Sequence, residues 1–260
     1  MSWERESEVA REAARAAGAI IADHGRGARE SWDKTEDNPV THADLEANKA
    51  IVRLLREAFP KDSILSEETR DSSERLAAER VWIIDPLDGT KEFIAGIPEF
   101  AVSVALVVRG DPVVGVVYQP LTDECFWGRA GGGAHLGKKR LRVSRLQDLG
   151  RATVLSSRTE MKRGQMDPFA ELFGRFQPIG SVALKLAYIA AGRGDLWISA
   201  APKSEWDVCG GDLLVREAGG TFRTLAGGVR TYNQSDVLLQ PLMAAGPPRL
   251  VERFGQLARP

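Results

Sequence analysis

The stretch that decides the fold runs Val81-Trp-Ile-Ile-Asp85-Pro86-Leu87-Asp88-Gly89-Thr90-Lys91. Its four apolar residues predict a buried strand over residues 81–84, and Asp85-Pro86 predicts that this strand ends there, because proline has no N–H for pairing. The strand delivers two carboxylates at its carboxyl end, where open α/β sheets place ligands. Gly89 allows a close backbone approach, and Thr90 begins a short helix whose N–H groups suit a phosphate.

Two carboxylates three residues apart on a tight turn can bridge hard cations. All-oxygen ligation of this kind favours Mg²⁺ over zinc. Asp, Pro and Gly are also ordinary residues of surface turns, so the motif alone leaves both interpretations open.

Further carboxylates at the ends of predicted elements favour the metal site: Glu67 and Glu68 after a short strand, Asp207 at the start of a helix, and Asp44 at the start of another. The adjacent Glu67 and Glu68 repel each other unless a cation or solvent relieves them. Each position also has a structural alternative. These are a solvated strand end for the two glutamates, helix N-terminus stabilisation for Asp207, and a capping box with Thr41 for Asp44.

The hydrophobic periodicity predicts a mixed α/β chain. Helices are expected over residues 2–24, 42–59, 72–79, 167–173, 182–191, 206–218 and 248–257. Strands are expected over residues 63–66, 81–84, 101–108, 113–118, 152–156, 176–179 and 195–199 and near 221 and 242, with no element in the polar stretch 25–38. We expect an α+β half over residues 1–147 that carries most metal ligands, and an α/β half over 148–260 that completes the site and the substrate pocket.

The composition suits a globular protein with a full-sized core. The chain has 260 residues, of which 43% are hydrophobic and 27% charged, and 35 basic against 36 acidic residues give a net charge of −1. This argues against intrinsic disorder and gives no electrostatic reason to expect a nucleic-acid polymer or a membrane as partner. The start of the chain lacks the apolar core of a signal peptide, and two cysteines are too few for a disulfide framework, so we expect a cytoplasmic protein.

Three motifs in order resemble the inositol monophosphatase superfamily of Mg²⁺-dependent, lithium-sensitive phosphatases. They are LSEE at 65–68, DPLDGT at 85–90 and WDVCGGDLLVREAGG at 206–220. The resemblance covers nearly the whole chain. It implies a layered αβαβα sandwich, two or three Mg²⁺ ions, a small phosphorylated substrate and a homodimer.

Carried over by residue, the resemblance assigns metal ligation to Glu67, Asp85, the Leu87 carbonyl, Asp88 and Asp207. It gives Gly89 and Thr90 the substrate phosphate. Thr90 and Asp44 would orient and deprotonate the attacking water, with Glu68 as a carboxylate behind the ligands. The substrate would also meet the metal-binding residues Glu67, Leu87, Asp88 and Asp207.

Within the superfamily, DPLDGTKEFI at 85–94, GSVALK at 180–185 and PKSEWD at 202–207 resemble the 3′(2′),5′-bisphosphate nucleotidase branch, which removes the 3′-phosphate of adenosine 3′,5′-bisphosphate. Lys185 suits a second phosphate; alternatively it is an exposed lysine on an amphipathic helix. Inositol-specific members instead carry a Glu shortly before the WD aspartate, where this chain has Ser199-Ala200-Ala201.

Three other functions remain to be weighed. An inositol-1-monophosphatase, with or without fructose-1,6-bisphosphatase activity, is the first alternative. A haloacid-dehalogenase phosphatase would need D-x-D-G-T, whereas this chain has one residue more between the two aspartates. A non-catalytic binding or regulatory relative is the third alternative, although every ligand position holds a competent residue.

Overall fold

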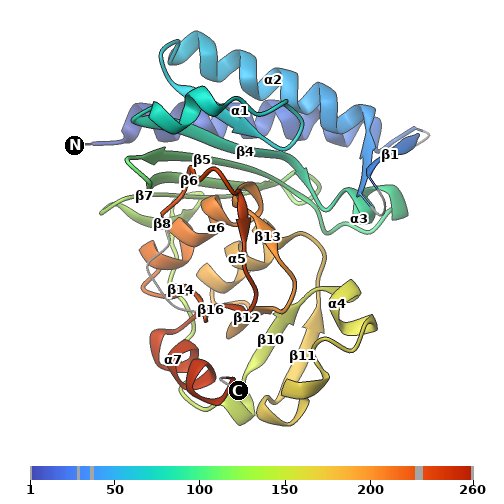
Figure 1. Cartoon of the computed structure of the whole chain (residues 1–260), viewed down its shortest axis with the longest axis vertical. Helices are drawn as coiled ribbons and strands as arrows, with labels where there is room; N and C mark the ends of the chain where they lie inside the picture. The colour runs from blue at the N-terminus through green and yellow to red at the C-terminus, as the bar shows by residue number, and fades with distance from the viewer. Residues whose placement is uncertain (1, 28–29, 36–37, 226–230, 259–260) are drawn as a thin grey trace.

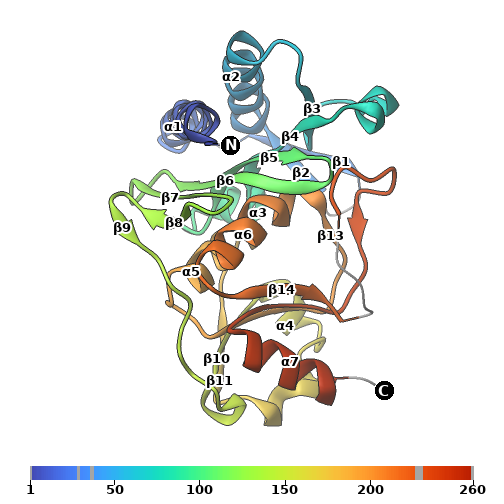
Figure 2. The same ribbon diagram turned by 90° about the vertical axis from the view of Figure 1, so that its left-hand side faces the viewer.

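The computed structural model describes residues 2–27, 30–35, 38–225 and 231–258. Helices and sheets alternate in layers, as Figures 1 and 2 show. Helices α1 (Glu4–His24) and α2 (His42–Ala58) cover a seven-stranded sheet. Helices α5 (Val182–Ala190) and α6 (Glu205–Glu217) lie between this sheet and a five-stranded sheet, and α7 (Pro248–Leu257) covers the far side. The predicted αβαβα sandwich is therefore confirmed.

The seven-stranded sheet has its strands in chain order. Only its first pair is parallel, and each later pair is antiparallel. Fully buried alanines of α1 let that helix lie close against the sheet. The strands are β3 (Ser63–Ser66), β4 (Arg80–Asp88), β5 (Ala101–Val108), β6 (Asp111–Gln119), β7 (Glu124–Arg129), β8 (Gly133–Leu136) and β9 (Lys139–Arg140).

The five-stranded sheet has the order β11-β10-β12-β16-β14. Strand β10 pairs in parallel with both neighbours, and β16 runs antiparallel to its own neighbours. The predicted βα alternation thus gives parallel pairing only in the first three strands of this half. The strands are β10 (Thr153–Ser156), β11 (Arg175–Pro178), β12 (Leu196–Ser199), β14 (Thr221–Thr224) and β16 (Met243–Gly246).

Shorter elements join these layers. Two small antiparallel pairs are β1 (Ser31–Thr35) with β2 (Asn38–Thr41), and β13 (Lys203–Ser204) with β15 (Leu238–Leu239). The short helices are α3 (Thr90–Ala95) and α4 (Arg158–Lys162), and the 3₁₀ helices are η1 (Ser73–Ala77), η2 (Leu149–Arg151) and η3 (Asp167–Leu172). No helix within the described ranges is long and apolar enough to cross a membrane.

Several sequence-based expectations about these elements were wrong. The strand predicted to stop at Ile84 continues to Asp88, because a register shift between Asp85 and Asp88 accommodates Pro86 within the pairing with β5. The polar stretch 25–38 contains strand β1, and residues 158–162 form the unpredicted helix α4. Residues 167–172 form a 3₁₀ helix rather than an α-helix.

Helix α6 lies directly on the backbone of β6 because two glycines face each other. A Cβ on Gly115 would lie 2.6 Å from the carbonyl oxygen of Gly210. This close approach fixes the start of α6, and with it Asp207, against the seven-stranded sheet.

Helix α6 also carries a buried carboxylate away from the pocket. Asp212 is 5% exposed. It accepts a 2.8 Å hydrogen bond from the Tyr232 hydroxyl and forms a 3.0 Å ion pair with Arg216. Burial raises the pKa of Asp212 to about 6, although Arg216 and Tyr232 oppose this rise. The raised pKa means that this group favours the folded state most below pH about 4, and that this contribution is lost as the pH rises through about 6.

We therefore expect Asp212→Asn to remove part of the pH dependence of stability. The free energy of unfolding of the unmodified protein should fall, relative to the variant, by up to about 3 kcal/mol between pH 4 and pH 7. Urea unfolding of both proteins across this pH range measures the difference between their free energies of unfolding. The contributions of the other titrating groups cancel in this difference. A constant difference across the range would contradict the expectation.

Candidate active site

Three carboxylates from two layers meet at one point. Asp85 and Asp88 come from the end of β4, and Asp207 comes from the first turn of α6. One oxygen of each lies within 4.8 Å of the others. Asp85 and Asp88 are 1% and 8% exposed, so this is a buried cluster of like charges. The family resemblance assigned these three residues to one metal site, and the fold brings Asp207 to the other two from a distant part of the chain.

Burial and mutual repulsion make the cluster unfavourable without a counter-charge. Burial raises the pKa of Asp85 well above its usual range, and Glu67, Asp88 and Asp207 raise it further. Burial likewise raises the pKa of Asp207 to about 8. A divalent cation would remove this repulsion, and an all-carboxylate oxygen set fits Mg²⁺ by charge and ligand type.

Asp88 is held in place by the start of α5. Its Oδ2 accepts hydrogen bonds of 2.6 Å from both the Ser181 hydroxyl and the Ala183 amide. Both donors bind the same oxygen, and the described part of the chain gives no hydrogen bond to Oδ1. This arrangement orients the carboxylate while leaving one oxygen for a cation.

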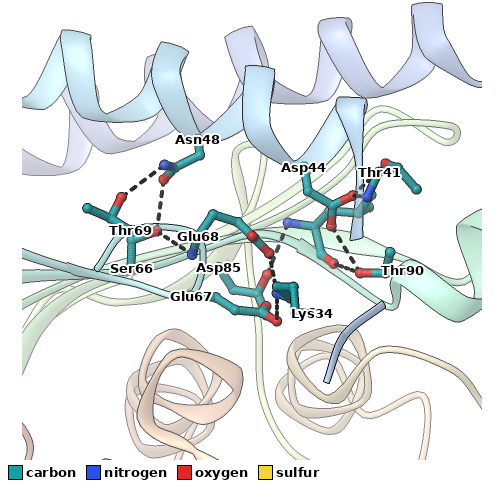
Figure 3. A network of polar contacts seen from close by, with 11 residues as sticks. Lys34, Thr41, Asp44, Asn48, Ser66, Glu67, Glu68, Thr69, Asp85 and Thr90 are labelled. Atoms are coloured by element: carbon teal, nitrogen blue, oxygen red, sulfur yellow. Dashed lines mark hydrogen bonds and ion pairs between the residues drawn. The ribbon is translucent and has the colours of Figure 1, made fainter. Parts of the chain in front are cut away.

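Asp44 links the start of α2 to Thr90. The Thr41 amide and hydroxyl donate to Asp44 Oδ2 at 2.8 and 2.5 Å, which forms a capping box. The Thr90 hydroxyl lies 3.0 Å from Asp44 Oδ1 and 3.1 Å from the Leu87 carbonyl oxygen (Figure 3). The capping box and the predicted pairing with Thr90 therefore occur together, one on each carboxylate oxygen. Burial raises the pKa of Asp44, which makes it a stronger base than an exposed aspartate.

Lys34 of β1 relieves the repulsion between the adjacent glutamates. Its ammonium lies 2.7 Å from Glu67 Oε1 and 2.6 Å from Glu68 Oε1, as Figure 3 shows. The sequence indicated that Glu67 and Glu68 need a cation or solvent, but it did not identify Lys34, because no element was predicted in its segment. A metal ion at Glu67 would share this carboxylate with Lys34.

A pocket of about 220 Å³ opens on the cluster. Every residue predicted to bind the substrate lines it; these are Glu67, Leu87, Asp88, Gly89, Thr90, Lys185 and Asp207. Asp85 lines it too, whereas Asp44 and Glu68 are absent from the lining. Gly89 has a φ of +100°, and a Cβ there would lie 2.9 Å from the Glu99 carbonyl oxygen, so this position requires glycine.

Lys185 is 2% exposed, so the alternative of an ordinary exposed lysine is wrong. Helix α5 lies between the two sheets, and most of its residues are buried. The Lys185 ammonium donates to the carbonyl oxygens of Ile179 at 2.9 Å and Gly180 at 3.3 Å. Burial lowers its pKa to about 8.

The sequence did not reveal Glu160 and Lys203. Glu160 of α4 is 3% exposed and accepts hydrogen bonds from the Ser199 hydroxyl, the Ala200 amide and the Lys203 ammonium at 2.8–2.9 Å. The segment 199–201, which carries no acid of its own, thus packs against an acid from a distant helix. The motif PKSEWD contained Lys203, but only the fold shows that it lines the pocket.

Comparison with known proteins agrees with this geometry. The family model of the inositol monophosphatase family matches residues 2–257. The "Nus factor SuhB" of Pasteurella multocida is 37% identical over 95% of this chain and 92% of its own length. The inositol monophosphatase of Anabaena (Nostoc) sp. has a TM-score of 0.82 and 28% identity, with 98% of this chain and 96% of that chain covered. CysQ of Bacteroides thetaiotaomicron has a TM-score of 0.79 and 29% identity, with 94% and 97% covered. The chain belongs to the inositol monophosphatase family and is a metal-dependent hydrolase of phosphate monoesters.

Proposed function

We propose that this protein is a cytoplasmic, Mg²⁺-dependent phosphatase that prefers adenosine 3′,5′-bisphosphate to inositol 1-phosphate. The observation that carries this proposal is that the carboxylate cluster and the buried Lys185 line the same pocket. One end of the pocket suits a metal-bound scissile phosphate, and a buried ammonium suits a second phosphate.

The residues divide the work of hydrolysis in the following way. Asp85, Asp88, Asp207, Glu67 and the Leu87 carbonyl would hold two or three Mg²⁺ ions. When bound, Mg²⁺ neutralises phosphoryl oxygens and lowers the pKa of water. Gly89 and Thr90 contact the phosphate. The Thr90 hydroxyl takes a proton from the attacking water while it passes its own proton to Asp44 Oδ1, 3.0 Å away. The water oxygen bonds to phosphorus as the bond from phosphorus to the ester oxygen breaks, and the leaving alkoxide takes a proton from solvent. No covalent phosphoenzyme is required.

The surroundings of segment 199–201 disfavour inositol. Glu160 is an acid that hydrogen-bonds to this segment, and three donors of the protein already bind its two oxygens. A carboxylate has about four acceptor positions, so Glu160 has about one left for the several hydroxyls of an inositol ring. Hydroxyls left without partners in a buried pocket cost about 1–3 kcal/mol, which is roughly tenfold to a hundredfold in specificity.

We expect the kcat/KM for adenosine 3′,5′-bisphosphate to exceed that for inositol 1-phosphate by roughly tenfold to a hundredfold. Fructose 1,6-bisphosphate is the third substrate of the comparison, because it carries a second phosphate without a nucleobase. Phosphate release measured under one Mg²⁺ concentration ranks all three. A higher kcat/KM for inositol 1-phosphate would overturn the nucleotidase proposal and leave the broader phosphatase assignment.

Lys185→Ala is expected to raise KM for the bisphosphate and to change hydrolysis of a simple phosphate monoester little. Since Lys185 also donates to two carbonyls, the variant loses stability, and activity is compared at a temperature where thermal unfolding shows it folded. An equal effect on both substrates would contradict a role in binding the second phosphate.

A non-catalytic binding or regulatory role is the alternative from another class of function, and the SuhB relatives are named as Nus factors. The complete set of carboxylates in the pocket favours catalysis. Phosphate release from the three substrates with Mg²⁺ decides between the two functions. We further propose a homodimer, which sedimentation of the purified protein tests.

A further inference from the structure

Lys203 is a second cation in the pocket. It lies in β13, four residues before Asp207, and lines the same pocket as Asp207 and Lys185. Its side chain is 13% exposed, and its only hydrogen bond within the described part of the chain joins its ammonium to Glu160 Oε1 at 2.8 Å. An ammonium has three N–H donors, so two of them remain available at the pocket wall.

Glu160 holds Lys203 at this position from the opposite side. The Glu160 side chain is 4% exposed, and its oxygens accept hydrogen bonds from the Ser199 hydroxyl, the Ala200 amide and Lys203. A carboxylate this deeply buried is costly unless it is paired and hydrogen-bonded. Glu160 is therefore fixed by two donors of β12 and its following turn, and Lys203 is the charge that pairs with it.

The charge of Lys203 acts on both ends of the pocket. Burial raises the pKa of Asp88 and of Asp207, and the Lys203 ammonium opposes the rise in each. Burial lowers the pKa of Lys185, and the Lys203 charge lowers it further. Lys203 thus lines the same pocket as the carboxylate cluster and Lys185, close enough for its charge to act on both.

The two lysines differ from the nearby Arg158 in what they bind. Arg158 pairs with Glu99 and lies 3.8 Å from Glu92, so acidic partners already balance its charge. Lys185 donates to two neutral carbonyls and has one N–H left. With the two of Lys203, three donors are available to one group of acceptor oxygens.

We propose that Lys203, positioned by Glu160, acts with Lys185 to bind a second phosphate of the substrate, distant from the phosphate that is hydrolysed. Lys203 is a specificity-determining residue, and Glu160 is a positioning residue. This inference rests on the proposed phosphatase activity, but it does not require the substrate to be a nucleotide.

The test compares substrates that differ only in the second phosphate. The first pair is adenosine 3′,5′-bisphosphate and adenosine 3′-monophosphate, and the second is fructose 1,6-bisphosphate and fructose 1-phosphate. Lys203→Ala is expected to lower the ratio of kcat/KM, bisphosphate over monophosphate, by roughly tenfold or more, with the change in KM rather than kcat. Lys203→Arg keeps the charge and is expected to restore most of the ratio.

Glu160 is tested with variants that keep the shape of the pair. Glu160→Gln is expected to lower the same ratio less than Lys203→Ala. The double variant Glu160→Gln/Lys203→Met should show no more loss than Lys203→Met alone, because the two residues act as one unit. This double variant removes both charges together, so it also provides a folded protein if a lone Glu160 charge prevents folding. Ser199→Ala removes another donor to Glu160 but keeps the Lys203 charge, so it is expected to lower the ratio less than Lys203→Ala does.

The outcomes separate this inference from the proposed function. An unchanged ratio in Lys203→Ala or in the folded double variant, for both substrate pairs, overturns the role of Lys203. Lys203→Ala could instead change the Mg²⁺ concentration for half-maximal activity and leave the kcat/KM ratio unchanged. That result would mean that Lys203 only offsets the negative charge of the carboxylate cluster, and it too overturns the inference. Preference of the unmodified protein for inositol 1-phosphate overturns the nucleotidase proposal alone, provided that Lys203→Ala still lowers the ratio for the fructose pair.

Discussion

Replacing Asp88 by Asn is expected to lower kcat by about 10²-fold or more, the scale for loss of a preorganised electrostatic group. The structure gives the reason. Asp88 Oδ2 is occupied by the Ser181 hydroxyl and the Ala183 amide, and both are donors. An asparagine must offer its carbonyl oxygen to these two groups, so its NH₂ group replaces Oδ1 and faces the carboxylate cluster, where a cation needs an oxygen. The variant loses a ligand atom as well as a charge.

The fold is expected to survive this change, because the asparagine oxygen keeps both hydrogen bonds to the start of α5. Circular dichroism and thermal unfolding check the fold, and steady-state phosphate release measures kcat. Near-normal turnover in a folded Asp88→Asn protein would show that this turn is only structural.

Removal of divalent cations is expected to abolish turnover, and Mg²⁺ is expected to restore it. Asp85, Asp88 and Asp207 place oxygens within 4.8 Å of one another, and this concentration of charge requires a counter-ion before an anionic phosphate can approach. Ca²⁺ should inhibit, because it binds carboxylates but takes longer bonds and looser geometry than Mg²⁺. Inhibition by lithium is expected from the family resemblance.

A readout independent of activity accompanies this experiment. Mg²⁺ that binds only the folded protein raises its stability, by about 2.7 kcal/mol at a concentration a hundredfold above the dissociation constant. We therefore expect the melting temperature to rise with Mg²⁺, and to rise less in Asp88→Asn. Full activity after exhaustive chelation would refute the metal requirement.

The sequence predicted those parts of the molecule in which local pattern and tertiary environment agree. Strand β3 and helix α7 have the predicted bounds. In α7, the buried residues Leu250, Val251 and Phe254 follow the spacing of one helix face. The carboxylates of the site were also recognised, because each lies near the end of a strand or in the first turn of a helix. Only the family resemblance joined them into one site.

The remaining features depend on contacts between distant segments. Lys34 lies in strand β1, a mostly polar segment without hydrophobic periodicity, so the sequence showed neither the strand nor the ion pairs with Glu67 and Glu68. The burial of Lys185 results from the sheets on both sides of α5. Glu160 pairs with Lys203, which lies forty-three residues later in the chain, so no local sequence pattern predicts this contact.

The two capping boxes bear on how such a chain can change over evolutionary time. Asp44 and Asp207 each accept a hydrogen bond from the backbone amide that begins a helix, so they serve folding as well as the pocket. A descendant that abandoned catalysis would still be selected to keep both. The Asp85 side chain accepts a short-range hydrogen bond from the Leu87 amide. Without a cation, its buried negative charge destabilises the folded protein. Among diverged copies of this protein, loss of Asp85 should therefore mark lost activity earlier than loss of either capping aspartate.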